Sequence, residues 1–262
     1  MSDIVCTMGR KMGDVLFAMV NARQISRLNK KRVDFITSNY CMPIVSLIQH
    51  QSYIDNVFVS KEFTDQCDSE HPETPWNYEG KLPEWKQVYN YGFPRFPDIS
   101  IPYWYTKGLY TLPDPPWKIE YPDWKITQDK YFVMVPAMRY RNDEVYCDVL
   151  NQLPYKTIVL GSPGEELSKP RSDTVQLCGV LDMKQSAAVL ARAEAVITPL
   201  SSNAILGSLV GAKLVVPFSG LETLKIFGVY SDTVTYVHKP YTYSEEGPSA
   251  KDIIKAAMSY AT

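Results

Sequence analysis

The first thirty residues read as a strand, a glycine-containing loop and a helix. The apolar run Ile4–Cys6 leads into a loop that contains Gly9 and Gly13, and apolar residues then recur at helical spacing to about Leu28. This order places the loop at the carboxyl end of a parallel strand, which is where open α/β sheets bind ligands. The loop and helix start also contain two cations and a carboxylate: Arg10, Lys11 and Asp14. The stretch therefore holds most parts of a phosphate-handling or acid/base site.

The same alternation of strands and helices continues in two halves. In the first half, we expect strands at 33–37 and 54–59 and a helix at 42–50. In the second half, the expected strands are 131–135, 157–160, 175–177, 195–198, 213–217 and 234–237, and the expected helices are 143–153, 183–193, 203–210 and 249–259. The pattern predicts an α/β protein with parallel, doubly wound sheets in two Rossmann-like domains, residues 1–124 and 125–262.

Residues 71–124 differ in character from both halves. All five tryptophans and ten of the nineteen prolines lie in this segment. Proline at this density disfavours long helices and central strands, while the aromatic content is too high for disorder. We interpret the segment as compact and irregular, completing the first domain. Its aromatic rings either pack under loops or form a platform on which a sugar or a base stacks.

Composition narrows the functional classes. A net charge of −2 over 262 residues argues against a protein coated all over by nucleic acid. The five cysteines form no CxxC pair, and His50, His71 and His238 have no metal-ligand spacing, so we expect reduced thiols and no metal site. Asp3 and Arg10 interrupt the start of the chain, and no apolar run approaches about 18 residues, so we expect neither signal peptide nor membrane span. The expected location is the cytoplasm.

Two α/β halves in this order resemble glycosyltransferases of the GT-B fold, in which two Rossmann-like domains face each other across a cleft. The run 12–16, Met-Gly-Asp-Val-Leu, resembles the opening of family 9 transferases, the ADP-heptose:lipopolysaccharide heptosyltransferases. Residues 159–165 resemble the strand and glycine-rich turn of that family, and residues 177–179 with 188–197 are similar to its "LxG … LLARADLVI" run. The resemblance covers residues 1–60 and 130–220.

The resemblance implies inverting transfer from a nucleotide sugar, which acts as co-substrate, with neither metal nor cofactor. Asp14 matches the general base that takes the proton of the acceptor hydroxyl; the structural alternative is a helix N-cap. Arg139 and Arg141 lie where the family places a lysine for the diphosphate, and Glu165 and Leu181 match positions at the ribose and the base. The alternative for Arg139 and Arg141 is that they are simply solvated. The alternative for Ser201, Ser202 and Asn203 is that they only cap a helix. The full set of expected donor contacts is Gly13, Arg139, Arg141, Gly161, Glu165, Leu181, Ser201, Ser202 and Asn203.

Two departures from the family pattern concern the donor. The family has an aspartate and a histidine at the turn that leads from strand to helix in the second domain. Here those positions are Pro199 and Ala204. We therefore expect the same chemistry with a donor other than ADP-heptose.

The acceptor is predicted from charge. Residues 9–32 contain seven cations and one acid, a local excess of six positive charges in a chain of net −2. If these cations form one patch beside Asp14, with Arg10 and Lys11 contacting the acceptor, the acceptor is a polyanion. Two acceptors fit: a phosphorylated lipopolysaccharide-type glycan, and DNA with a hydroxylated base that is flipped out for reaction. The second would make the protein similar to the phage DNA-base glycosyltransferases, which also have the GT-B fold, and would place it in the host cytoplasm. The alternative is an ordinary solvated helix face.

Two rival functions remain at this stage. One is a nucleotide-sugar epimerase, although the histidine characteristic of GT-B epimerases is not evident. The other is a non-catalytic module that binds sugar nucleotides or nucleic acid. Replacing Asp14 by asparagine discriminates, because a binding module would not depend on that carboxylate.

Overall fold

The structure is a computed structural model, and it describes residues 2–8, 11–60, 84–90, 117–136, 143–218, 233–238 and 248–261. These residues form two compact units. Unit 1 contains the described residues up to 90 together with 119–121, and unit 2 contains 117–118 and the described residues from 122 onward. The chain thus crosses between the units within 117–122, and the division into domains at residue 124 stays a prediction.

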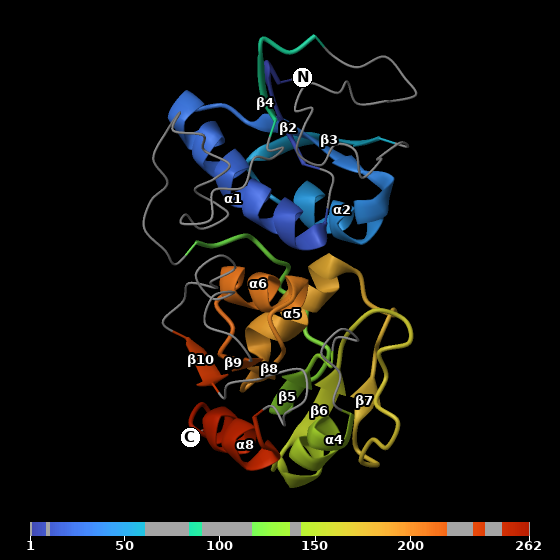
Figure 1. Cartoon of the computed structure of the whole chain (residues 1–262). Coiled ribbons are helices and arrows are strands. Elements are labelled where there is room, and N and C mark those ends of the chain that lie inside the picture. The colour runs from blue at the N-terminus through green and yellow to red at the C-terminus, as the bar shows by residue number, and fades with distance from the viewer. Residues whose placement is uncertain are drawn as a thin grey trace. The chain divides into compact units, whose positions relative to one another are not determined.

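Unit 1 is built on a parallel sheet whose described strands lie in the order β3-β2-β1-β4. The chain passes from β1 to β2 to β3 in one direction, so right-handed crossovers put the two connecting helices on one face, as Figure 1 shows. In chain order the elements are β1 (Ile4–Thr7), α1 (Met12–Asn29), β2 (Val33–Ser38), the 3-10 turn η1 (Asn39–Cys41), α2 (Met42–Gln49), β3 (Ile54–Ser60) and β4 (Gln87–Asn90). After β3 the chain returns to the other side of β1, so the direction of winding reverses between β1 and β4.

Strand β4 was not expected from the sequence. It lies inside the proline- and tryptophan-rich segment and pairs in parallel with β1, from Ile4 opposite Gln87 to Thr7 opposite Asn90. It has only four residues, two of them polar amides, and so has no apolar run that would predict a strand. Its pairing partner, rather than its own sequence, determines its conformation.

Unit 2 has a larger sheet, with described strands in the order β10-β9-β8-β5-β6-β7, all parallel. In chain order its elements are β5 (Tyr131–Met134), α4 (Asp143–Gln152), β6 (Lys156–Val159), β7 (Val175–Gln176), α5 (Met183–Arg192), β8 (Val196–Ile197), α6 (Ser202–Leu209), β9 (Leu214–Phe218), β10 (Val234–His238) and α8 (Ala250–Met258). The chain winds outward from β5 to β7 and then returns to the other side of β5. The sheet is therefore doubly wound, as predicted, with its reversal between β5 and β8.

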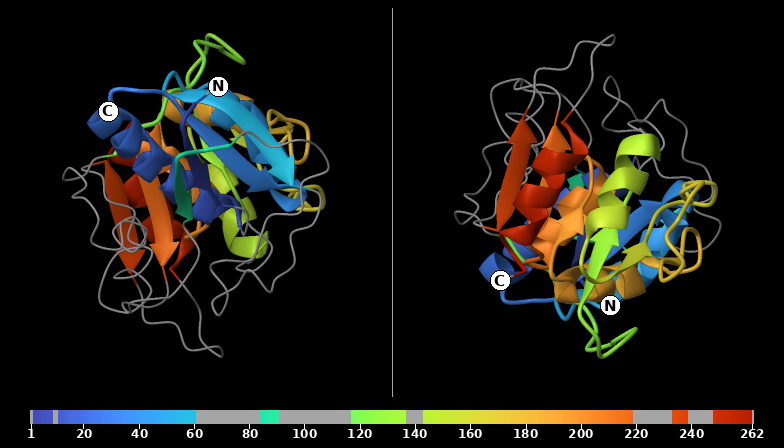
Figure 2. Two further views of the ribbon diagram at one scale, coloured as in Figure 1. Left: turned by 90° about the horizontal axis from the view of Figure 1, so that it is seen from above. Right: turned by 90° about the horizontal axis from the view of Figure 1, so that it is seen from below.

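Helices cover both faces of the unit 2 sheet. Helices α4 and α8 lie side by side on one face, and α5 and α6 lie on the other (Figures 1 and 2). Buried side chains of the sheet and of α4 and α8 form one core, including Phe132, Met134, Tyr146, Leu150, Val159, Ile197, Val215 and Ile253. This core packs the strands of unit 2 against α4 and α8.

Two findings bear on the predicted environment. No helix in the described part of the chain is long and apolar enough to span a membrane. Cys6, Cys41, Cys147 and Cys178 are buried, and none of these four described cysteines forms a disulfide. The cytoplasmic location stays a prediction.

Candidate donor and base sites

The winding of the unit 2 sheet reverses between β5 and β8. Strand β5 is followed by α4 on one face of the sheet and β8 by α6 on the other, and such a switch point is the usual ligand crevice of a doubly wound sheet. The turn after β6 lies beside it, because β6 pairs directly with β5. The expected donor residues of unit 2 that the structure describes follow β6, β7 and β8, so the topology brings these segments to one edge of one sheet.

Helix α6 begins directly after β8 at this edge. Ser201 is its N-cap residue, with extended backbone (φ −145°), but its side chain does not cap the helix as the sequence suggested. The Ser201 hydroxyl instead lies 3.3 Å from Oγ1 of Thr198. The first backbone N–H groups of a helix have no partner within the helix, and they carry partial positive charge. Ser202 and Asn203 belong to this first turn, which therefore suits an anion such as a diphosphate.

The glycine-rich turn after β6 is closed by Glu165. Oε2 of Glu165 accepts a hydrogen bond from the Ser162 N–H at 2.7 Å, and the Glu165 N–H donates to the Ser162 carbonyl at 3.1 Å. Glycine at position 161 leaves room for this carboxylate, because a Cβ there would lie 2.5 Å from Oε2 of Glu165. Gly164 has a φ of +87°, which also favours glycine. The sequence motif thus encodes a tight turn that holds one carboxylate at the sheet edge.

Leu181 lies on the segment that connects β7 to α5. The next residue, Asp182, caps α5 through a reciprocal pair of hydrogen bonds with Gln185, at 2.7 Å and 3.1 Å. The Gly179 N–H donates to the Gly161 carbonyl at 2.8 Å, which joins this segment to the glycine-rich turn. Leu181 and Glu165 therefore belong to neighbouring, mutually bonded segments.

Asp14 lies at the corresponding edge of unit 1, where that sheet reverses between β1 and β4. It is the third residue of α1, whose N-cap is Lys11 with extended backbone (φ −131°). The alternative of Asp14 as an N-cap is therefore wrong, although a carboxylate in the first turn still interacts favourably with the helix dipole. Gly13 precedes it in the same turn, and both residues are partly exposed. The structure thus places the expected base at the carboxyl end of its sheet.

The neighbours of Asp14 include residues that the sequence analysis missed. Burial raises the pKa of the Cys41 thiol and the Asp14 charge adds to this, whereas the neighbouring Ser38 side chain lowers it. Asp14 is therefore close to the η1 turn after β2. Tyr40 and Met42, on either side of buried Cys41, are 67% and 53% exposed. The sequence could have indicated these residues, because β2 pairs in parallel with β1 and its carboxyl end therefore lies at the same edge of the sheet.

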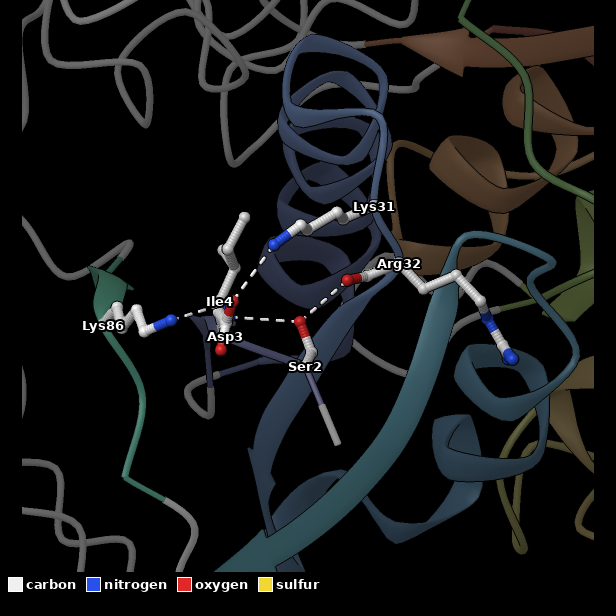
Figure 3. A network of polar contacts seen from close by, with 6 residues as sticks. All are labelled: Ser2, Asp3, Ile4, Lys31, Arg32 and Lys86. Atoms are coloured by element: carbon white, nitrogen blue, oxygen red, sulfur yellow. Dashed lines mark hydrogen bonds and ion pairs between the residues drawn. The ribbon is translucent and has the colours of Figure 1, made fainter.

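The described cations of residues 11–32 do not form one patch. Helix α1 separates Asp14 from Lys31 by about 25 Å, at 1.5 Å per residue. At that far end Lys31 pairs with Asp3 at 3.0 Å, and Arg32 pairs with Asp55 at 3.2 Å. Figure 3 shows Lys31 and Lys86 both directed at Asp3, with the Ser2 hydroxyl bonded to the Arg32 carbonyl. The positive excess counted along the sequence is therefore spread over the length of a helix and partly neutralised.

Several expected residues lie outside the described residues or carry no polar group. Arg10, Arg139 and Arg141 are not among the described residues. Pro199 and Ala204 are buried in the strand-to-helix turn and in α6. Neither has a polar side-chain atom to offer a donor. Among the described residues, no group of histidine, cysteine or acidic side chains could hold a metal ion.

The folds of the two units define a class. Two Rossmann-like α/β units, each reversing at its sheet edge, are the arrangement found in GT-B glycosyltransferases, and comparison with solved structures confirms this fold. A glycosyl transferase family 9 structure from Veillonella parvula matches with a TM-score of 0.73 at 14% identity, covering 100% of this chain and 98% of that one.

Two Escherichia coli structures extend the comparison. ADP-heptose lipopolysaccharide heptosyltransferase II matches with a TM-score of 0.69 at 12% identity, covering 100% of this chain and 98% of that one. Heptosyltransferase WaaC with ADP matches with a TM-score of 0.63 at 12% identity, covering 98% and 97%. No family model matches the sequence. No curated protein sequence matches it either. At 12% to 14% sequence identity, the likeness to these structures shows the fold alone.

Proposed function

We propose that this protein is a glycosyltransferase that moves a sugar from a nucleotide-sugar donor to a hydroxyl of its acceptor. The observation that carries the proposal is the placement of Asp14 at the switch point of unit 1, in a chain whose fold matches family 9 transferases along its length. In unit 2 the glycine-rich turn and the start of α6 lie at the matching edge. Two solved neighbours, heptosyltransferase WaaC with ADP and heptosyltransferase TibC in complex with ADP-D-β-D-heptose, support a nucleotide sugar as the donor class.

The proposed reaction is an inverting displacement. The acceptor hydroxyl attacks the anomeric carbon, and the bond from that carbon to the diphosphate oxygen breaks on the opposite face. The nucleoside diphosphate leaves with the bonding electron pair, and Asp14 accepts the hydroxyl proton. The first turn of α6 stabilises the departing negative charge, a task for which helix N-termini suffice without a metal. Glu165 holds the ribose of the donor, and Leu181 contacts its base.

The acceptor side of the proposal rests on Lys11, Tyr40 and Met42. Lys11 is exposed and adjoins the helical turn that carries Asp14. The exposed ring of Tyr40 offers a face on which a sugar or a base could stack, since both stack on aromatic rings. We propose an anionic acceptor, either DNA with a hydroxylated base or a lipopolysaccharide-type glycan. The distal cations Lys31 and Arg32 are assigned no part in it.

A thermal-shift screen tests the donor half of the proposal. The purified protein is heated with ADP-, GDP-, UDP- and CMP-sugars and with the free nucleotides. A ligand that binds only the folded state stabilises it by about 2.7 kcal/mol at a hundredfold excess over its dissociation constant. A selective shift with one nucleotide identifies the donor. Absence of any shift in folded protein contradicts the proposal.

Transfer assays test the other half. The donor identified by the screen is incubated with hydroxymethylated DNA and, separately, with phosphorylated lipopolysaccharide core, and transfer of the sugar is followed by mass spectrometry. The Asp14→Asn variant serves as the control that should bind donor without transferring it. Donor binding with no Asp14-dependent transfer would favour the binding-module alternative, and interconversion of the donor sugar would favour the epimerase.

A further inference from the structure

The loop that carries the glycine-rich turn is fixed by a side chain outside it. After β6 the chain runs through residues 160–174 and returns as β7, which pairs in parallel with β6. Gln176 is in β7, and its amide faces Leu167 in the loop. The Leu167 N–H donates to Oε1 of Gln176 at 2.7 Å, and Nε2 of Gln176 donates to the Leu167 carbonyl at 3.4 Å. One glutamine thus satisfies both backbone groups of a loop residue, as a neighbouring strand would.

The two hydrogen bonds between Gln176 and Leu167, here called the Leu167 clasp, lie close to Glu165 in the sequence. Leu167 is 2% exposed and packs into the core formed with α4 and α8, so its position is set from two directions. Glu165 is two residues earlier, and its carboxylate already bonds the Ser162 N–H. The clasp therefore fixes the chain directly after the residue that closes the turn.

Two further attachments fix the ends of the loop. At the start, the Gly179 N–H bonds the Gly161 carbonyl, and the Pro163 ring packs so closely on Gly179 that a Cβ there would lie 2.5 Å from it. At the far end, the Arg171 guanidinium donates to the carbonyls of Leu150, Leu153 and Tyr155, at 3.1, 2.7 and 2.7 Å. Gln176 holds Leu167, which lies between these two points and two residues after Glu165.

We infer that Gln176 is a positioning residue for donor binding, which acts by holding Glu165 through the Leu167 clasp. The inference rests on the proposed function, because it requires that Glu165 contacts the donor. It assigns a role to a residue that the sequence analysis treated only as part of a strand. Gln176 itself is not assigned any contact with the nucleotide.

A double-mutant cycle tests the inference. The full chain and its Gln176→Ala, Glu165→Ala and doubly substituted variants are titrated with ADP, GDP, UDP and CMP by calorimetry. If Gln176 acts through Glu165, each single substitution weakens binding of the same nucleotide by about five- to tenfold, the range expected when one positioned hydrogen bond is lost. The double variant should then bind no more weakly than Glu165→Ala alone, because residues that act through one another are not additive.

Two further variants separate positioning from general damage. Gln176→Glu keeps the acceptor for the Leu167 N–H, so its affinity should stay within about twofold of the parent protein. Gln152→Ala removes an amide that bonds the Asp148 carbonyl on the exposed surface of α4, at 3.2 Å, and should leave binding unchanged. Melting temperatures without nucleotide report whether each variant is folded.

The outcomes distinguish the inference from the proposed function. If Glu165→Ala weakens binding but Gln176→Ala behaves like Gln152→Ala, the inference is overturned and the donor site stands. Additive losses in the double variant also overturn it, because Gln176 would then act independently of Glu165. If Glu165→Ala changes the affinity for none of the four nucleotides, the proposed donor site fails and the inference fails with it.

Discussion

Asp14 is the residue on which the proposed chemistry depends, and its place in the first turn of α1 defines a clean substitution. Asparagine has the same shape but cannot accept the acceptor proton, so Asp14→Asn should lower kcat by a factor of about 10² to 10⁴. The lost charge near the helix N-terminus should cost only about 0.3–1 kcal/mol of stability. Nucleotide-induced thermal shifts should persist, since the donor residues belong to unit 2.

The matched control for Asp14→Asn is Asp3→Asn at the other end of β1. Asp3 pairs with Lys31 and Lys86 on the surface of unit 1, at 3.0 and 3.4 Å. Transfer rates of this variant should equal those of the parent protein. Full activity in Asp14→Asn would remove the assignment of the base.

A second prediction at this scale concerns Gly161. The methyl group of Gly161→Ala would collide with Oε2 of Glu165, the atom that closes the turn. The carboxylate must then move, and nucleotide affinity should fall severalfold in a titration. Gly211→Ala is the control: its φ is +78° with open space around a Cβ, so it should cost about 1–2 kcal/mol in urea unfolding and leave affinity unchanged. Equal affinities in both variants would contradict a role for the turn.

At the scale of elements, the described helices and most strands were predictable because each is an apolar pattern bounded by breakers. Strand β4 was not, because its polar residues become a strand only by pairing with β1. The turn around Glu165 was located by its glycines. The attachment of the following loop by Gln176 and Arg171 could not be predicted, because those contacts join residues nine to twenty-one positions apart.

Arg171 supports a prediction about the stability of this region. Its guanidinium bonds carbonyls at and beyond the end of α4, where a helix leaves its last carbonyls without partners. Hydrogen bonds to a charged group contribute about 1.5–3 kcal/mol. Arg171→Met should therefore lower the free energy of unfolding by about that amount at neutral pH, measured by urea titration. A loss below about 0.5 kcal/mol would mean that water replaces these bonds.

The same arginine predicts a pH dependence. The hydrogen bond from Arg171 lowers the pKa of the Asp173 carboxyl below its ordinary value of 3.8. A depressed folded-state pKa contributes stability that is present above the unfolded value and is lost as pH falls through the folded value. The difference in unfolding free energy between the parent and Asp173→Asn should be constant from pH 5 to 7 and shrink below about pH 4. A difference that grows on acidification would contradict the pairing.

At the scale of the whole molecule, counting charges along the sequence suggested one basic patch, whereas the described cations are spread along α1. The cations of residues 9–32 are neighbours in sequence, yet α1 places Lys11 and Lys31 about 30 Å apart. If the acceptor is a polyanion bound at Asp14, Lys11→Gln should raise its KM and reduce the dependence of KM on salt by about one charge. Lys31→Gln, the matched control, should change neither. Equal effects of the two variants would favour a long basic surface instead.

The segment that joins the two units supplies the last prediction. Gln51, 1% exposed, pairs with the backbone of Glu120: its Nε2 donates to the Glu120 carbonyl and its Oε1 accepts from the Glu120 N–H, both at 2.9 Å. The Glu120 carboxylate separately accepts from the N–H and hydroxyl of Ser52, at 2.6 and 2.5 Å. The crossing segment is therefore attached to unit 1 by a buried amide and by an exposed carboxylate.

These two attachments should differ in strength. Gln51→Ala leaves two part-buried backbone groups without their partner and should cost about 1–3 kcal/mol, whereas Glu120→Ala removes solvent-exposed bonds and should cost about 0.5–1.5 kcal/mol. Hydrogen exchange at residues 119–121 should accelerate more in Gln51→Ala, because local opening follows the loss of buried bonds. Nucleotide affinity should be unchanged in both, since the donor residues lie in unit 2. If Glu120→Ala accelerates exchange as much as Gln51→Ala, the carboxylate rather than the buried amide holds the crossing, and the assignment of strengths is reversed.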